Sequence, residues 1–400
     1  MESLKELFKI GPGPSSSHTM GPEKACIYVL NTHKEANNFV VTLFGSLALT
    51  GKGHLTDRII ANTLGKTRTK IVFNIKRKTL PHPNYFIIQS FVDDKQIAKT
   101  ECISIGGGNV IINGNLQNSK NVYSFKNFEE IKCYSLKNNI LLPEIVYKFD
   151  DSDIKDYLNQ IYDVMIDSIH RGLKNTGDLP GILHLKRKAS YLQKPNIDNE
   201  DDENRHIRVI SSYAYAVSEE NAAGSIIVTA PTCGSCGVLP ATLYYLQTRY
   251  NIKREDIIDA LAVAGLIGVI FKSNASISGA FAGCQSEIGT ACSMASGAAN
   301  FLKSNSNIET IECAAEIGME HFLGLTCDPV KGLVQIPCIE RNAVAALRSV
   351  ENASLAMFLE STRKISLDTV INTMYETGKD LNNKYKETSK GGLAKNYKKK

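Results

Sequence analysis

The sequence predicts an α+β protein, with an N-terminal α/β domain followed by a larger all-helical domain. The chain has 400 residues, of which 43% are hydrophobic and 22% charged, so it can bury a large core and favours two domains. Runs rich in β-branched and aromatic residues are concentrated before about residue 125. From about residue 152, Gly- and Ala-rich runs with helical periodicity replace them.

Strand-like runs make up the predicted sheet of the N-terminal domain, and the segment VDDKQ between two of them is typical of a hairpin turn. Helices over 23–30 and 54–64 complete the α/β unit. The strand-like runs are FVVTLFGS (39–46), TKIVFNIKRK (69–78), NYFIIQSFV (84–92) and KQIAKTECISI (95–105).

Helical spacing begins at residue 152, where Asp151 or Ser152 is the expected cap and Gly172 lies near the expected stop. Apolar residues recur there at Ile154, Leu158, Ile161, Met165 and Ile169. Further helices are expected over 253–271, 285–303, 307–323 and 338–359. We therefore expect an α/β domain over 1–145, a connecting helix and polar linker over 146–205, and a helical domain over 206–400.

Charge and hydropathy exclude several classes of protein. The formal net charge is +5, but basic and acidic residues are interleaved, so no nucleic-acid partner is expected. The longest apolar run, 260–271, is too short to cross a membrane, which takes about 20 residues. The N-terminus lacks the pattern of a secretory signal, so we expect a cytoplasmic protein. The 10 scattered cysteines then favour thiols or metal ligands over disulfides.

Three cysteines lie at turns or helix ends marked by Gly or Pro: Cys284, Cys327 and Cys338. Converging thiolates at such positions could hold an iron–sulfur cluster. With three ligands instead of four, one iron would stay open as a Lewis acid for a substrate. Spacing alone leaves the alternative open that these are ordinary buried cysteines, because none lies in a compact C-x-x-C motif.

The C-x-x-C pair, Cys233 and Cys236, stands in TAPTCGSCGVLP. The pattern is compatible with a thioredoxin-like redox pair or half of a zinc site, although a second ligand pair for zinc is missing from the sequence. Its Gly and Pro frame equally suits a close approach of backbone to a ligand.

Two glycine-framed histidines are candidates for proton transfer. His18 lies in GPGPSSSHTMGP, which could cradle an anion ahead of a helix or simply cap that helix. His54 lies in TGKGHLTD, just after a strand, where loops often present catalytic groups. A third glycine-rich turn, SIGGGN (104–109), is a weak phosphate-binding signal.

Taken together, five long motifs resemble the iron–sulfur-dependent L-serine dehydratases, in the form that fuses the β and α parts in one chain. The motifs are GPGPSSSHTMGP, GSLALTGKGHLTD, TAPTCGSCGVLPA, KSNASISGAFAGCQSEIGTACSMASGA and GLTCDPVKGLVQIPCIERNA, and the match runs from about residue 3 to 392.

The resemblance implies that the helical domain is catalytic and binds a [4Fe–4S] cluster through Cys284, Cys327 and Cys338. It implies conversion of L-serine to pyruvate and ammonia, with His18 and His54 as candidate acid/base groups and the C-x-x-C pair as a wall of the site. The candidate substrate-binding residues are Ser15, Ser16, Ser17, Thr19, Ser276 and Ser278. We also expect a homo-oligomer, a dimer, acting in serine catabolism and gluconeogenesis.

The sequence departs from the family pattern at two points. It has no cysteine after Cys338, and Lys331 stands where glycine is more usual. Three other functions compete with the dehydratase. They are a pyridoxal-phosphate enzyme with SIGGGN as phosphate cradle, a non-catalytic amino-acid or redox sensor, and a redox enzyme built on the C-x-x-C pair.

Overall fold

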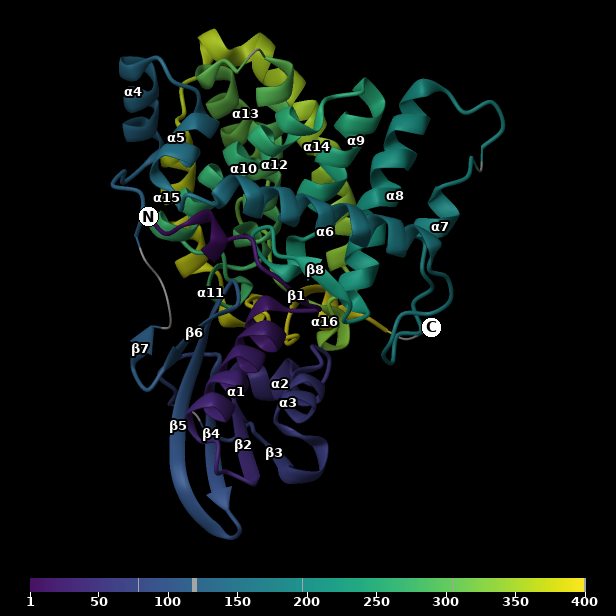
Figure 1. Cartoon of the computed structure of the whole chain (residues 1–400). Coiled ribbons are helices and arrows are strands. Elements are labelled where there is room, and N and C mark those ends of the chain that lie inside the picture. The colour runs from purple at the N-terminus through teal and green to yellow at the C-terminus, as the bar shows by residue number, and fades with distance from the viewer. Residues whose placement is uncertain (78, 117–120, 196, 305, 399–400) are drawn as a thin grey trace.

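The computed structural model describes residues 1–77, 79–116, 121–195, 197–304 and 306–398. A sheet covered by helices forms one end of the molecule, and a larger helical body forms the other (Figure 1). The predicted order of an α/β part followed by a larger helical part is confirmed.

The described strands of the main sheet lie in the order β3-β2-β4-β5-β6-β7. Strand β2 runs parallel to β3 and antiparallel to β4, and the later neighbours are antiparallel. The predicted hairpin joins β4 to β5, and Lys78 of the predicted strand 69–78 lies outside the described residues. The bounds are β2 (Asn38–Phe44), β3 (Thr69–Asn74), β4 (Tyr85–Val92), β5 (Lys95–Gly106), β6 (Asn109–Ile112) and β7 (Asn115–Leu116).

Helices α1 (Gly21–Thr32), α2 (Gly45–Thr50) and α3 (Thr56–Leu64) accompany this sheet (Figure 1). Helices α1 and α3 lie over one face, and their apolar side chains pack on alternate strand residues such as Phe86 and Ile88. This alternation follows from the two-residue period of a strand. The sheet therefore has its own core.

The helical body is built around α10 and α12, whose Gly- and Ala-rich sequences allow neighbouring helices to approach closely. The bounds are α4 (Phe128–Asn138), α5 (Leu142–Phe149), α6 (Ile154–Lys174), α7 (Ala189–Leu192), α8 (Asp202–Ala222), α9 (Val238–Tyr250), α10 (Arg254–Asn274), α11 (Gly279–Ala282), α12 (Ile288–Lys303), α13 (Ile308–Glu320), α14 (Cys338–Leu359), α15 (Leu367–Asp380) and α16 (Gly392–Asn396). No helix among the described residues is long and apolar enough to cross a membrane.

One detail of α6 differs from the prediction, since its N-cap is Asp153 rather than Asp151 or Ser152. Gly172 lies in the last turn, two residues before the helix ends at Lys174, so its predicted place near the stop is confirmed. The glycine is there for packing, because a Cβ at that position would overlap the carbonyl oxygen of Ala216 on α8. The polar linker also ends earlier than predicted, since α8 begins at Asp202.

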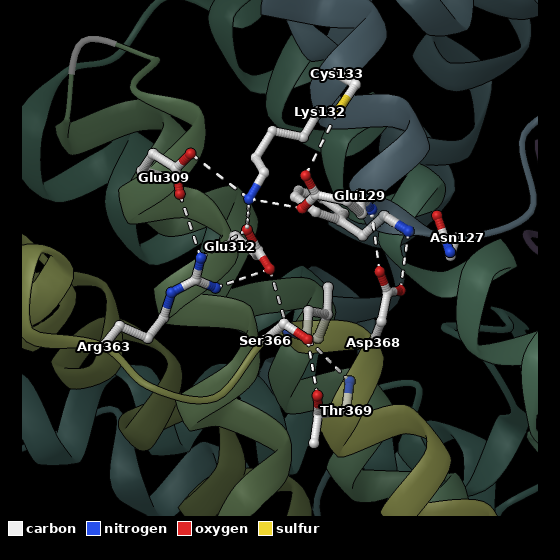
Figure 2. Close-up of polar contacts among 12 residues, drawn as sticks. Asn127, Glu129, Lys132, Cys133, Glu309, Glu312, Arg363, Ser366, Asp368 and Thr369 are labelled. Carbon is white, nitrogen blue, oxygen red and sulfur yellow. Dashed lines mark hydrogen bonds and ion pairs between the residues drawn. The ribbon is translucent and has the colours of Figure 1, made fainter.

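Segments near the N-terminus and after the sheet pack into the helical body. Strand β1 (Ile10–Pro12) pairs antiparallel with β8 (Ile226–Val228), and Leu4, Leu7 and Phe8 lie in the helical core. Figure 2 shows how α4 is held there. Asp368 of α15 accepts hydrogen bonds from the first N–H groups of α4, and Lys132 of α4 lies 2.9 Å from Glu312 of α13. The predicted boundary at residue 145 remains a prediction, but these contacts join α4 to the helical body, and Ile145 and Val146 of α5 lie in its core.

Candidate active site

The serine-rich stretch forms a short π-helical turn, Ser16–Met20, that leads directly into α1. The Ser15 hydroxyl caps this turn by accepting a hydrogen bond from the N–H of His18 at 3.1 Å. His54 follows α2, and its carbonyl oxygen accepts a hydrogen bond from the Thr19 hydroxyl at 2.9 Å. The imidazole rings of His18 and His54 stack with centroids 4.4 Å apart. The two predicted histidines therefore meet in one buried cluster.

The hydrogen-bond partners distinguish the two imidazoles. His18 is fully buried, and its two ring nitrogens lie 2.8 Å from the Ser17 hydroxyl and 3.0 Å from the Ser46 hydroxyl. Burial lowers the pKa of His18 to about 4, so this ring is neutral at pH 7. His54 directs Nδ1 at the Thr50 carbonyl at 3.0 Å. Since a carbonyl can only accept, Nδ1 carries the hydrogen and Nε2 of the neutral ring keeps its lone pair.

A carboxylate from the C-terminal segment completes this cluster. The Oε1 atom of Glu387 lies 3.4 Å from Nε2 of His54 and 3.7 Å from Nδ1 of His18. Its backbone N–H donates to the Cys327 carbonyl at 2.9 Å, and its carbonyl accepts from the Ser46 hydroxyl at 3.2 Å. Burial opposes ionisation of Glu387, but the charge that each imidazole carries when protonated, together with a hydrogen bond to His54, outweighs it and lowers the pKa of this carboxyl. The sequence analysis did not identify Glu387.

The three predicted cysteine ligands are brought to the same region. Cys284 follows Gly283 in a short helical turn, Cys327 lies in the loop after α13, and Cys338 is the first residue of α14. All three are buried, and the ligand atoms of Cys284, Cys327 and Glu287 lie within 4.8 Å of one another. The Cys338 thiol interacts electrostatically with Cys284, and Glu387 interacts with all three thiols.

Two further titratable residues, Arg341 and Glu287, border the thiols, and neither was predicted from the sequence. Arg341 donates to the Thr326 carbonyl at 2.6 Å and lies 3.3 Å from Asp328. A hydrogen bond with Cys327, together with the Arg341 guanidinium, lowers the pKa of the Cys284 thiol against the effect of burial. Glu287 accepts from the Thr232 hydroxyl at 2.7 Å, and burial raises its pKa well above the usual range. The three thiols are thus soft sulfur ligands with one nearby cation, the guanidinium of Arg341.

The predicted substrate-binding residues divide into two sets. Ser15, Ser17 and Thr19 make the hydrogen bonds that hold the turn and the two histidines, while Ser16 lies buried in the same turn. On the cysteine side, the Ser276 hydroxyl accepts from the N–H of Ser278 at 3.1 Å. These residues surround the two halves of the site, and their contact with a substrate remains a prediction.

The C-x-x-C motif lies against the same site. Cys233 and Cys236 are both buried as free thiols, and burial raises the pKa of both. A redox-active pair needs a thiolate with a lowered pKa, so this environment disfavours the redox-enzyme alternative. Thr232 reaches Glu287, and a Cβ on Gly234 would lie 3.0 Å from the same carboxylate. This contact agrees with the motif forming a wall of the site.

Lys331 has an exposed side chain and a backbone in the left-handed region, with φ of 56°. A glycine adopts this conformation without strain, which gives a physical reason for glycine to be usual there.

Comparisons with known proteins agree with these observations. The family model described as "Serine dehydratase beta chain" matches residues 3–67, and the model described as "Serine dehydratase alpha chain" matches residues 57–394. The chain is 39% identical to L-serine dehydratase TdcG of Escherichia coli, over 98% of this chain and 99% of that protein. It is 38% identical to an L-serine dehydratase of Helicobacter pylori, over 99% of each chain. An L-serine dehydratase of Streptomyces coelicolor is 37% identical over 98% of each chain.

The matches cover both halves of the chain in the expected order, and each of these relatives is aligned over nearly its whole length. This chain therefore belongs to the serine dehydratase family of lyases, in the form that carries the beta and alpha parts on a single polypeptide.

Proposed function

We propose that this protein is an L-serine ammonia-lyase that converts L-serine to pyruvate and ammonia, using a [4Fe–4S] cluster bound by Cys284, Cys327 and Cys338. The names of its full-length relatives support the reaction. The observation that carries the proposal is a buried histidine, whose Nε2 keeps a lone pair in the neutral ring, beside a group of buried thiols. In that group Cys284 and Cys327 lie close together, and Cys338 interacts electrostatically with Cys284. Glu387 joins the two groups, since it contacts the imidazoles and the Cys327 backbone.

The chemistry of the donor set fits an iron–sulfur cluster. Three buried thiols are its usual type of ligand, and the Arg341 cation lies where it can balance the negative charge of thiolates. Gly279 leaves room beside the sulfurs, because a Cβ there would lie 3.3 Å from Sγ of Cys327. When bound through three thiolates, such a cluster supplies an open iron that acts as a Lewis acid toward the hydroxyl oxygen of serine.

The residues of the chain then supply the proton transfer. Nε2 of His54 removes the α-proton of serine, since Nδ1 is committed to the Thr50 carbonyl. The electron pair of the broken C–H bond forms the Cα=Cβ double bond and the C–O bond breaks. The departing hydroxide takes the proton now held on Nε2 of His54 and leaves as water, which restores the base. The released aminoacrylate tautomerises to an imine, which water hydrolyses to pyruvate and ammonia. His18 is neutral and bonded through both nitrogens, so it packs against His54 and positions that ring.

Burial of the site supports the same chemistry. The two histidines, Glu387 and the three cysteines all have exposed fractions below 9%, so bulk water is kept from the reacting atoms. Fixed polar groups act more strongly on developing charge when water is excluded. We propose that the buried hydroxyls of the serine-rich turn and of Ser278 contribute to this environment.

The test is anaerobic purification followed by assays of iron, acid-labile sulfide and pyruvate formation from L-serine. About four of each per chain, together with pyruvate, is the expected result. Turnover without iron would favour the alternative of a pyridoxal-phosphate enzyme. Iron without turnover would favour the alternative of a non-catalytic sensor.

His54→Ala should retain iron and sulfide but lose about 100- to 10,000-fold in kcat, the usual contribution of a general base. His321→Ala is a matched control, because His321 makes the same Nδ1 contact to a carbonyl four residues earlier, at 2.8 Å, but is exposed at the end of α13. Near-normal kcat in His54→Ala would exclude it as the base.

Three wider expectations remain part of this proposal. They are a dimeric assembly, a cytoplasmic location, and a role in serine catabolism and gluconeogenesis. Size-exclusion chromatography with light scattering tests the first.

A further inference from the structure

Two buried polar side chains at one end of the sheet lack hydrogen-bond partners among the described residues. Asn84 and Ser104 are fully buried, and neither the two polar side-chain atoms of Asn84 nor the Ser104 hydroxyl has a partner. They are neighbours across β4 and β5, since the Ser104 N–H donates to the Asn84 carbonyl at 3.1 Å. Because strand residues alternate, Asn84 shares a face with Phe86 and Ile88, the face that packs against α1 and α3.

This end of the sheet lies beside the histidine cluster. The carbonyl of Pro83, next to Asn84, accepts from the N–H of Ser46 at 2.9 Å, and the Ser46 hydroxyl lies 3.0 Å from Nε2 of His18. Ser104 packs so closely on Gly21, the residue after the histidine turn, that a Cβ on Gly21 would overlap its hydroxyl.

The same end of the sheet also lies beside the cysteine group. A Cβ on Gly106, two residues beyond Ser104, would lie 3.3 Å from Cβ of Ser278. The next residue, Gly279, borders Sγ of Cys327. An open cavity of about 600 Å³, lined in part by Gly106, Ser276 and Lys272, adjoins this junction. Ser104 therefore borders the histidine side of the site through Gly21, and the chain two residues later borders the cysteine side through Gly106.

A buried polar group without a partner costs free energy, and no contact within the described chain offsets that cost here. A carboxamide offers both an acceptor and a donor, which matches the two charged groups of an amino-acid zwitterion. We propose that Asn84, assisted by Ser104, binds the head group of the substrate, with Oδ1 accepting from the α-ammonium and Nδ2 donating to the α-carboxylate. The inference rests on the proposed function, since it assigns how that site recognises an α-amino acid.

The test compares Asn84→Ala, Asn84→Leu and Ser104→Ala in the anaerobically purified holoenzyme. The chain offers a matched control in Ser90→Ala. Ser90 is also fully buried with an unpartnered hydroxyl and lies on the same strand face, but toward the other end of β4. Measurements are KM and kcat for L-serine, iron and sulfide per chain, thermal midpoint, and L-serine affinity by calorimetry in a His54→Ala background.

The Asn84 variants should raise KM and Kd for L-serine by about 10- to 100-fold, which is the effect of losing hydrogen bonds to charged groups. Their kcat should change less, iron and sulfide should stay, and the thermal midpoint should stay or rise because an unpartnered polar group is removed. Ser104→Ala should raise KM by a smaller factor, and Ser90→Ala should leave KM unchanged.

Unchanged KM and Kd in the Asn84 variants would overturn the inference. So would a lower thermal midpoint with unchanged KM, which would indicate that Asn84 binds an internal water and is structural. If Asn84→Ala does not fold, the other two variants still test the inference. Asn84→Leu keeps the volume of the side chain, and Ser104→Ala removes only one hydroxyl. Failure of the proposed function is distinguishable, because calorimetry measures L-serine binding without turnover.

Discussion

Replacing Glu387 by Gln tests whether the C-terminal segment belongs to the reacting machinery. In the wild-type protein its carboxylate lies 3.4 Å from Nε2 of His54, the atom that becomes part of a cation when it takes a proton. Two unit charges at that separation interact by about 5 kcal/mol at an effective dielectric of about 20. The neutral amide of Gln keeps part of this interaction as a hydrogen bond, and hydrogen bonds to charged groups contribute about 1.5–3 kcal/mol. The difference, about 2–3.5 kcal/mol, predicts that kcat falls about 30- to 400-fold.

The assay is steady-state pyruvate formation, with iron and sulfide measured on the same anaerobic sample. Gln preserves the volume of the side chain and the backbone contacts to Cys327 and Ser46, so the cysteine loop should remain in place. Glu376→Gln, an exposed carboxylate on α15, is the control and should change neither readout. A kcat within about threefold of wild type, with iron retained, would refute the electrostatic role of Glu387.

Three further predictions concern stability. The folded-state pKa of His18, about 4, lies below its unfolded value of 6.5, so the unfolded state takes the proton first and stability falls as the pH drops from 6.5 to 4. Urea unfolding at pH 7 and pH 5 should reveal a loss of about 2 kcal/mol that His18→Asn abolishes. Lys331→Gly should stabilise the protein by about 0.5–1 kcal/mol, because it relieves the left-handed backbone at an exposed residue. Gly172→Ala should lower stability by about 2 kcal/mol, measured by the same unfolding curves, because its Cβ would meet the backbone of α8.

Local composition and periodicity predicted the elements that carry them strongly. The β-branched and aromatic run 84–92 corresponds to β4, and the helical spacing of apolar residues from Ile154 corresponds to α6. Strands β1 and β8 have 3 residues each, which is too few to show a period. They pair with each other although they lie far apart in the sequence. Gly172 does lie near the helix stop, but a glycine in the sequence does not reveal that it also admits a neighbouring helix.

Only those residues of the candidate site that stand in a recognisable motif could be predicted from the sequence. His18, His54 and the three cysteines stand in Gly- or Pro-framed motifs, which mark positions where the backbone presents a side chain. Glu387 and Arg341 carry no such mark, because charged residues are common and their burial depends on tertiary contacts. One feature of the sequence could have pointed to Glu387, because this residue directly precedes the segment TSKGG, which ends in two glycines.

The contacts of that segment link the two halves of the site physically. Cys327 exchanges backbone hydrogen bonds with Tyr385 and Glu387 at 2.7 and 2.9 Å, so the cysteine loop is held by the strand that carries the carboxylate. The Leu393 N–H donates to Asp328 at 2.7 Å, and Asp328 in turn contacts Arg341. Displacing this segment would release the carboxylate from His54 and the support of Cys327 at the same time. In the proposed mechanism, cluster binding and proton transfer would therefore both depend on this short stretch of chain, so Glu387→Gln is judged on iron content as well as on kcat.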